Sequence, residues 1–173
     1  FTDYMFEMDY NPEEGWHDAR IVPYQDVPLS PANATLHYGQ AIFEGCKAYR
    51  YEGGKAVVFR AKDHIARLNR SAKILDIPEV DEKLVYDALM KLIDLEKDWI
   101  PDGPGQSLYI RPFIFSTDPY LGVSVGQYYK MMIILSPVGA YYANGFAPVK
   151  IMVEDTYVRA PKGGLGAAKT PAN

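Results

Sequence analysis

The order of strand-like and helix-like patterns is the feature that most constrains what this chain can fold into. Residues 44–50 and 55–60 flank Tyr51-Glu52-Gly53-Gly54 and predict a β-hairpin closed by a glycine turn. Two helical stretches follow, and residues 107–115 and 128–135 then predict two more strands, the second mostly buried because its apolar run is continuous. A β-β-α-α-β-β order with few βαβ crossovers is typical of an α+β fold. We therefore expect a two-layer antiparallel sheet with helices on one face.

Apolar residues at helical spacing predict both helices. The first helix ends before Pro78, which bars continuation. Its apolar stripe is Ile65, Leu68, Ala72 and Leu75. The second helix is predicted from about Asp81, a residue type favoured at N-caps, to Trp99. Its predicted buried stripe is Leu84, Ala88, Leu92, Leu95 and Trp99.

A break rich in glycine and tyrosine at 139–146 predicts a domain boundary, after Ser136-Pro137-Val138 ends the preceding strand. We expect a small N-terminal α+β domain over 1–140 and an interdomain linker over 141–147. Residues 148–173 would then open a second, larger domain, a pseudo-barrel, with a strand at 148–153. The sequence begins at Phe1 and stops without a polar tail, so we expect it to be roughly the first half of a longer enzyme.

Composition excludes several classes of function. A net charge of −4 gives no reason to expect a nucleic-acid partner, and no window approaches the ~20 apolar residues of a membrane span. Cys46 is the only cysteine, which excludes an internal disulfide and fits a reducing cytoplasm. The histidines lack metal-site spacing, so we expect no metal.

An arginine inside an apolar strand is the first candidate for a binding role. Because side chains alternate along a strand, Tyr109 and Arg111 share one face. A guanidinium there needs a partner, and its planar fork suits a carboxylate, which favours a pocket for an acid. An internal salt bridge, or an exposed sheet edge beside Pro112, explains the same pattern. From the spacing alone these structural explanations are favoured.

Lys169 is the second candidate, because it follows a run of glycine and alanine that begins at Gly163. A lysine desolvated in such a pocket loses part of its preference for the charged form, and its free amine can then form a Schiff base. A phosphate loop of the type GxxxxGK[ST] fits poorly, because Ala168 replaces the final glycine. A surface lysine in a mobile loop is the default alternative. Arg67 flanks the apolar stripe of its helix and could reach a phosphate or simply be solvated.

Together these segments resemble the branched-chain amino-acid aminotransferases, which are fold-type IV pyridoxal-phosphate enzymes. The resemblance covers nearly the whole chain, and its motifs occur in the family's order. These motifs are Leu36-His37-Tyr38-Gly39, Phe43-Glu44-Gly45, Phe59-Arg60, Arg67-Leu68-Asn69-Arg70-Ser71, Leu108-Tyr109-Ile110-Arg111-Pro112, Ser136-Pro137-Val138-Gly139, Tyr157-Val158-Arg159-Ala160 and the run Gly163–Lys169.

The resemblance implies a role for each matching position. Lys169 would hold pyridoxal 5′-phosphate as a Schiff base and move a proton between the substrate Cα and the cofactor. Arg67 would bind the cofactor phosphate, and Arg111 would seat an acidic substrate. The walls of the side-chain pocket would be Tyr38, Phe43, Tyr109 and Tyr141. Leu121 and Val123 would reach, with Tyr38, into the active site of a neighbouring subunit, which implies a homodimer.

The activity that the resemblance implies is amino-group transfer between leucine, isoleucine or valine and 2-oxoglutarate, in the cytoplasm. A D-amino-acid aminotransferase or an aminodeoxychorismate lyase, which share the lysine, ranks second. A catalytically incomplete fragment that acts only in dimerisation is a third alternative.

Overall fold

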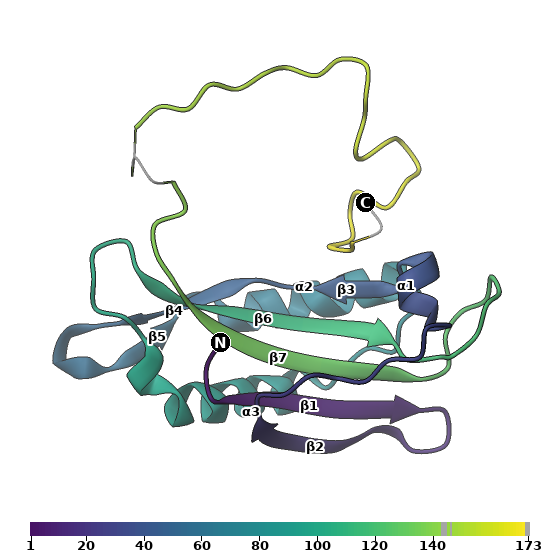
Figure 1. Ribbon diagram of the computed structural model, residues 1–173, viewed down its shortest axis with the longest axis horizontal. Coiled ribbons are helices and arrows are strands. Elements are labelled where there is room, and N and C mark those ends of the chain that lie inside the picture. Colours follow the sequence, from purple (N-terminus) through teal and green to yellow (C-terminus); the bar gives the residue numbers. More distant parts are fainter. Residues whose placement is uncertain (143–144, 146, 172–173) are drawn as a thin grey trace.

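The computed structural model describes residues 1–142, 145 and 147–171, and within them a seven-stranded antiparallel sheet forms the body of the molecule (Figure 1). The strands are β1 (Tyr4–Asn11), β2 (Gly15–Pro23), β3 (Ala41–Phe43), β4 (Cys46–Arg50), β5 (Ala56–Val58), β6 (Ser107–Ser116) and β7 (Tyr129–Val138). The helices are α1 (Ala34–Tyr38), α2 (Ala61–Ile74) and α3 (Glu82–Leu95), with short 3-10 turns η1 (Glu52–Gly54) and η2 (Lys97–Trp99).

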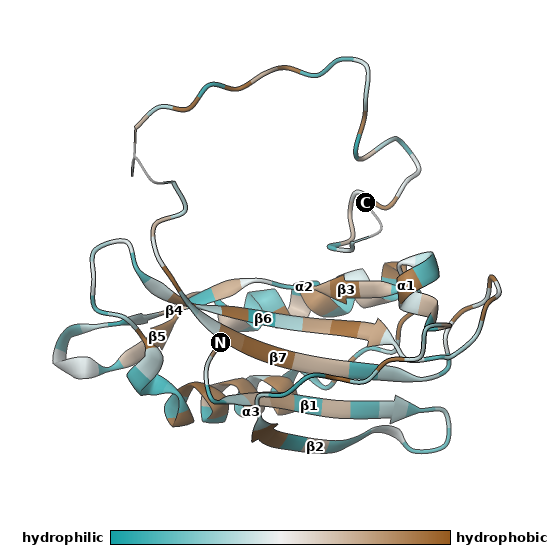
Figure 2. Cartoon of the chain, in the orientation of Figure 1, coloured by the Kyte–Doolittle hydropathy of each residue, from teal (hydrophilic) through white to brown (hydrophobic). Residues whose placement is uncertain are grey.

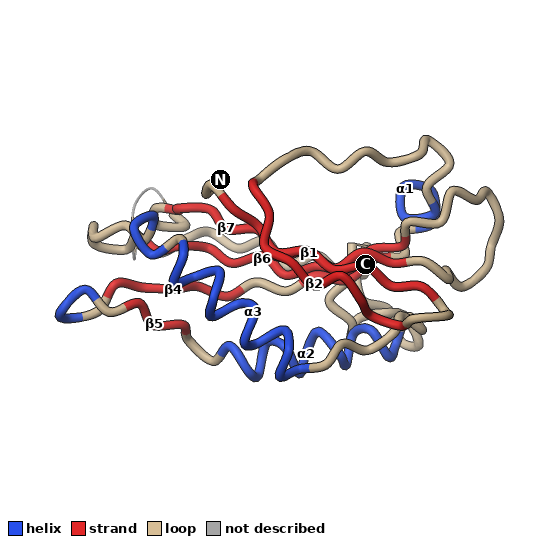
Figure 3. Tube along the Cα trace, turned by 90° about the horizontal axis from the view of Figure 1, so that it is seen from below, coloured by secondary structure: helices blue, strands red, loops and turns tan. Residues whose placement is uncertain are grey.

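The strands lie in the order β2-β1-β7-β6-β4-β5, and β3 also pairs with β6. Helices α2 and α3 cover one face of this sheet (Figure 3). The predicted α+β fold, with an antiparallel sheet and helices on one face, is confirmed. The main hydrophobic core lies between the two layers, where Leu68 and Leu89 from the helices meet Phe6, Ile110 and Ile133 from the strands. Figure 2 shows how hydrophobic the central strand β7 is along its middle. The described residues include no helix with the length and apolar character that a membrane crossing requires.

The two helices test the predicted stripes differently. In α2, Ile65, Leu68 and Ala72 are buried as predicted. Asp81 caps α3, accepting hydrogen bonds from the backbone of the first turn. The stripe predicted for this helix is confirmed at Leu92 and in part at Ala88, which is half-buried against the core, and it is wrong at Leu84, Leu95 and Trp99. Its buried residues are Val85, Leu89, Leu92 and Ile93, whereas Leu84, Leu95 and Trp99 are 41%, 52% and 40% exposed. The observed stripe is bulky at every position, and the predicted one contains Ala88, so the observed orientation buries more apolar area.

Two prolines in the central strands explain where the predicted strands hold and where they do not. Pro112 is tolerated in β6 because the backbone edge that lacks an N–H faces Glu44, at the point where the partner of β6 changes from β3 to β4 and the ladder is interrupted. The prediction that β7 breaks at Ser136 is wrong, since the strand runs to Val138 against β6. Pro137 is tolerated because it lies beyond Ile133, the last residue paired with β1, so its missing N–H faces no ladder.

The strand predicted at 148–153 is also wrong. No helix or strand forms in the described residues after Val138. Ile151, Met152 and Val153 are 84%, 82% and 88% exposed. An apolar run becomes a strand only when another strand satisfies its backbone, and no described strand pairs with these residues. Part of the predicted linker, residues 143–144 and 146, lies outside the described residues.

Candidate active site

The segment that carries Lys169 returns from the long connection after β7 to contact the sheet and α2 (Figure 1). Hydrogen bonds to α2 and β3 hold it there. Lys169 N donates to Ser71 Oγ at 2.9 Å, and Lys169 O accepts from Phe43 N at 3.0 Å. The Thr170 hydroxyl donates to the Ala41 carbonyl at 2.7 Å. These bonds fix the backbone of the lysine between α2 and β3, so its side chain starts from a defined position.

The Lys169 amine faces an open cavity of about 260 Å³ beside α2. Its Nζ lies 4.7 Å from the centre of the Phe43 ring, a cation–π geometry. The lining residues are Phe43, Arg67, Arg159, Gly166, Ala167, Ala168, Lys169 and Thr170. Among these described residues the charged side chains are all cationic, and the small residues leave space beside the amine. The cavity therefore suits an anionic ligand.

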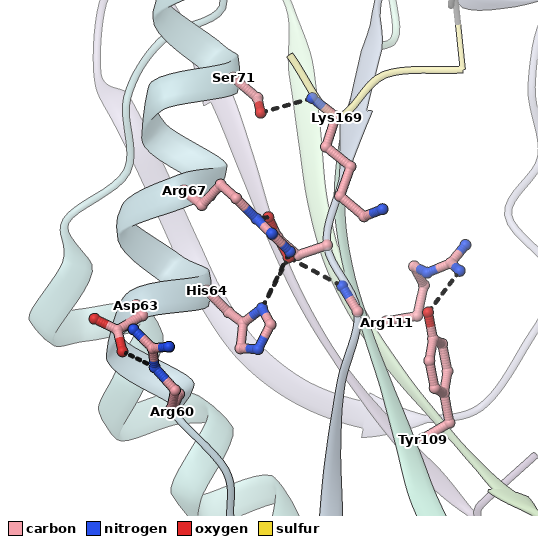
Figure 4. Close-up of polar contacts among 10 residues, drawn as sticks. Arg60, Asp63, His64, Arg67, Ser71, Tyr109, Arg111 and Lys169 are labelled. Atoms are coloured by element: carbon pink, nitrogen blue, oxygen red, sulfur yellow. Dashed lines mark hydrogen bonds and ion pairs between the residues drawn. The ribbon is translucent and has the colours of Figure 1, made fainter. Parts of the chain in front are cut away.

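Arg67 extends from α2 toward the side of Lys169 (Figure 4) and lines this cavity. The buried carboxylate of Glu44 holds it there. Nε and Nη2 of Arg67 donate to the two carboxylate oxygens at 2.6 and 2.8 Å. His64 Nδ1 lies 3.1 Å from the same carboxylate. Burial raises the pKa of Glu44, but the hydrogen bonds from Arg67, His64 and Gly45 outweigh it, so the pKa lies below its usual value. Arg67 and Ser71 are four residues apart, so one face of α2 holds both the guanidinium and the lysine backbone.

A second cavity of about 330 Å³ adjoins the first, and Phe43 lines both. Its other lining residues are Ala41, Ile42, Arg111, Phe113, Ile134 and Pro171. Arg111 Nη2 donates to the Tyr109 hydroxyl at 2.9 Å, and its guanidinium carbon lies 4.8 Å from the Phe43 ring centre. Its Nε is buried without a hydrogen-bond partner, and no described carboxylate forms an ion pair with it. The internal salt bridge considered above is therefore not formed with the described residues.

The structure brings Lys169, Arg67, Phe43, Arg111 and Tyr109 into one region. The other candidates line neither cavity. Tyr38 is the last residue of α1 and is 44% exposed. Tyr141 is 88% exposed, and its ring contacts the ring of Tyr142 edge-on. Leu121 and Val123, at 61% and 95% exposure, lie in the loop between β6 and β7.

Sequence reasoning missed Glu44, Ser71 and Arg159 as parts of the site. Glu44 stands between Phe43 and Gly45 in a recognised motif, yet no periodicity marks a carboxylate as buried. Ser71 occupies the helical position one turn after Arg67, which is the only local signal for it. Arg159 lines the cavity only because of the path taken by a segment without regular structure, and no local pattern predicts that path.

Cys46, next to the site, is predicted to be inert toward thiol reagents. It is 6% exposed, and burial with the nearby Glu44 raises its pKa to about 12. Relative to an ordinary thiol this lowers the thiolate fraction by roughly 10³-fold at neutral pH. Labelling the native whole protein and mapping the Cys46 peptide should show no adduct within the time that labels the urea-unfolded protein fully. Equal labelling rates in both states would contradict the burial.

Comparison with known proteins gives a consistent picture, although no protein-family model matches the chain. It is 53% identical over its whole length to branched-chain-amino-acid transaminase 1 of Bacillus subtilis, of which it covers 49%. A crystal structure of the Escherichia coli branched-chain amino acid aminotransferase matches the whole chain with a TM-score of 0.74 and 26% identity, over 53% of that chain.

A crystal structure of another branched-chain amino acid aminotransferase, from T.th., contains pyridoxamine 5′-phosphate. It matches 82% of the chain and 41% of its own, with a TM-score of 0.62 and 26% identity. The chain thus spans about half the length of the curated relatives it matches. Over its whole length, the chain is therefore homologous to the N-terminal half of the branched-chain amino-acid aminotransferases and has the fold of that half.

Proposed function

We propose that the whole protein containing this chain is an aminotransferase that moves an amino group between leucine, isoleucine or valine and 2-oxoglutarate, using pyridoxal 5′-phosphate. The observation that supports this most directly is the cation-lined cavity at Lys169, where one amine lies over an aromatic ring beside small residues. The B. subtilis transaminase and the T.th. enzyme with pyridoxamine 5′-phosphate support the same chemistry.

The residues present fit this cofactor. Arg67 and Arg159 line the cavity that contains the Lys169 amine, and both can donate to a phosphate. When bound, pyridoxal 5′-phosphate supplies an electron sink for the substrate Cα. Lys169 Nζ would hold the cofactor, would be released when the substrate amine takes its place, and would then be free to accept and return the proton of that Cα. Phe43 packs beneath the amine and limits the access of water from that side.

The second cavity fits both kinds of substrate. Arg111 offers donors that no described carboxylate uses, so it can receive the distal carboxylate of glutamate or 2-oxoglutarate. Phe43, Phe113 and Ile134 present apolar surface for a branched side chain. Tyr109 holds the guanidinium from the strand position two residues earlier. Tyr141 would complete this pocket from the connection after β7.

Assembly and domain organisation are part of the same proposal. Exposed Tyr38, Leu121 and Val123 would contribute to the active site of a second subunit in a homodimer. Residues 1–140 would form the small domain, residues 141–147 the linker, and residues 148–173 the start of the cofactor-binding domain. We propose a cytoplasmic location, in keeping with a single buried cysteine in this chain.

The test uses the purified whole protein. Its visible spectrum should show a bound cofactor, and borohydride reduction followed by peptide mapping should attach that cofactor to Lys169. Activity with leucine, isoleucine and valine should exceed that with D-alanine or aminodeoxychorismate. An adduct on Lys150 or Lys162 with Lys169 unmodified would overturn the assignment of the lysine. Turnover of only D-alanine or aminodeoxychorismate would overturn the substrate class.

A further inference from the structure

Glu44 is a buried acid that lies behind the lining of a cavity whose charged lining residues are all cationic. Its side chain is completely buried, and every polar contact it makes is with a donor of this region. The guanidinium of Arg67 binds both oxygens, Gly45 N donates to Oε2 at 3.2 Å, and His64 Nδ1 is 3.1 Å from the same atom. A buried carboxylate is tolerated only when it is paired in this way.

The contact fixes the direction of the guanidinium, not only its distance. Two parallel hydrogen bonds from a planar fork leave the group no rotation about its own plane. They use Nε and Nη2 of Arg67, and Nη1 forms no hydrogen bond with any described residue. Because the Arg67 side chain is 45% exposed and lines the cavity, its unused donors are available to a ligand there.

We infer that Glu44 is a positioning residue, which orients Arg67 so that its free donors meet the phosphate of the ligand bound at Lys169. The inference rests on the proposed function and adds to it the origin of phosphate selectivity. Glu44 itself does not touch the ligand, since it is absent from the residues that line the cavity. A purely electrostatic effect would have the opposite sign, because removing a negative charge beside a cationic cavity would strengthen anion binding.

The distinguishing measurement is the ratio of two affinities in the whole protein, freed of cofactor: that for pyridoxal 5′-phosphate and that for pyridoxal, which lacks the phosphate. In Glu44→Gln the amide offers one acceptor and turns a donor toward Arg67, so the fork is lost. We expect binding of the phosphorylated ligand to weaken by about 10- to 100-fold, as for a lost charged hydrogen bond, with little change for pyridoxal. A merely structural role would change both affinities together.

Asp63→Asn is the matched control. Asp63 lies on α2, the helix that carries Arg67, but its carboxylate pairs with Arg60 on the surface (Figure 4). The substitution should leave the ratio unchanged. In an Arg67→Gln background, Glu44→Gln should have no further effect on the ratio. That double variant removes both members of the buried pair, so it is less exposed to misfolding than Glu44→Gln alone.

Glu44→Asp is a second test. It keeps the charge, but its shorter side chain withdraws the carboxylate from the Arg67 guanidinium. It should therefore also lower the ratio of the affinity for pyridoxal 5′-phosphate to that for pyridoxal. An unchanged or higher ratio in Glu44→Gln or Glu44→Asp would overturn the inference, as would an equal loss in the Arg67→Gln background. Failure of the wild-type protein to bind either aldehyde would instead overturn the proposed function.

Discussion

Replacing Lys169 by alanine should abolish amino-group transfer in the whole protein while leaving the fold unchanged. The variant loses the amine that would bond the cofactor and move the substrate proton. Loss of the proton transfer alone predicts a fall in kcat of roughly 10²–10⁴-fold. The fold should survive, because the hydrogen bonds to Ser71 and Phe43 use the backbone of residue 169 and not its side chain.

Lys162→Ala is the matched control for this experiment. Lys162 belongs to the same irregular segment, is exposed, and lines neither cavity. Its replacement should change neither kcat nor the visible spectrum. Circular dichroism and thermal unfolding of both variants would verify that the fold is retained. Near-normal turnover by a folded Lys169→Ala protein would show that another group performs the chemistry.

The local patterns of the sequence predicted the hairpin, α2 and the central strands, because each depends on its own residues. The strands of residues 1–33, β1 and β2, are not among those predicted, although β1 has an alternating pattern. In β1, Phe6, Met8 and Tyr10 alternate with Glu7, Asp9 and Asn11 as a strand requires, yet Glu7 is only 7% exposed. Its charge is paired across the sheet, with Arg20 of β2 at 2.6 Å and Lys130 of β7 at 3.7 Å. Such pairing joins residues far apart in sequence, so a local pattern cannot reveal it.

The sequence likewise indicates some residues of the candidate site and not others. Lys169, Arg67 and Arg111 stand out as cations among small or apolar residues, and their side chains do gather around Phe43 and its two cavities. Glu44 could not be assigned, since its burial depends on Arg67 and His64 from a helix formed about twenty residues later. Whether Tyr38, Leu121 and Val123 serve a site in a second subunit stays a prediction, because that depends on residues outside this chain.

Replacing Gly45 by alanine should disrupt the proposed substrate pocket at Arg111 through a single methyl group. A Cβ at this position would overlap the Tyr109 hydroxyl oxygen and lie 3.0 Å from its Cζ. The tyrosine sits in a sheet between packed neighbours, so moving it should lower stability by about 1–3 kcal/mol, as overpacking does. It should also break the hydrogen bond to Arg111, the only one recorded for that guanidinium within the described residues.

We therefore expect Gly45→Ala to change the KM values of the two substrates by different amounts. Loss of an orienting hydrogen bond to a charged group should raise the KM for 2-oxoglutarate by roughly 10-fold, and the KM for leucine less, because leucine places no carboxylate at Arg111. Gly139→Ala is the control, since an added Cβ there meets nothing within 4 Å and should change neither KM nor Tm.

Adding Tyr109→Phe to Gly45→Ala removes the overlapping oxygen and leaves only the tighter contact with the ring. The double variant should therefore regain most of the lost stability, but not the affinity for 2-oxoglutarate, because Arg111 still lacks its hydroxyl partner. This separation distinguishes a steric effect on packing from an effect on the guanidinium. If Gly45→Ala raises both KM values equally, or if Tyr109→Phe restores 2-oxoglutarate binding, the glycine acts by another route than the placement of Tyr109.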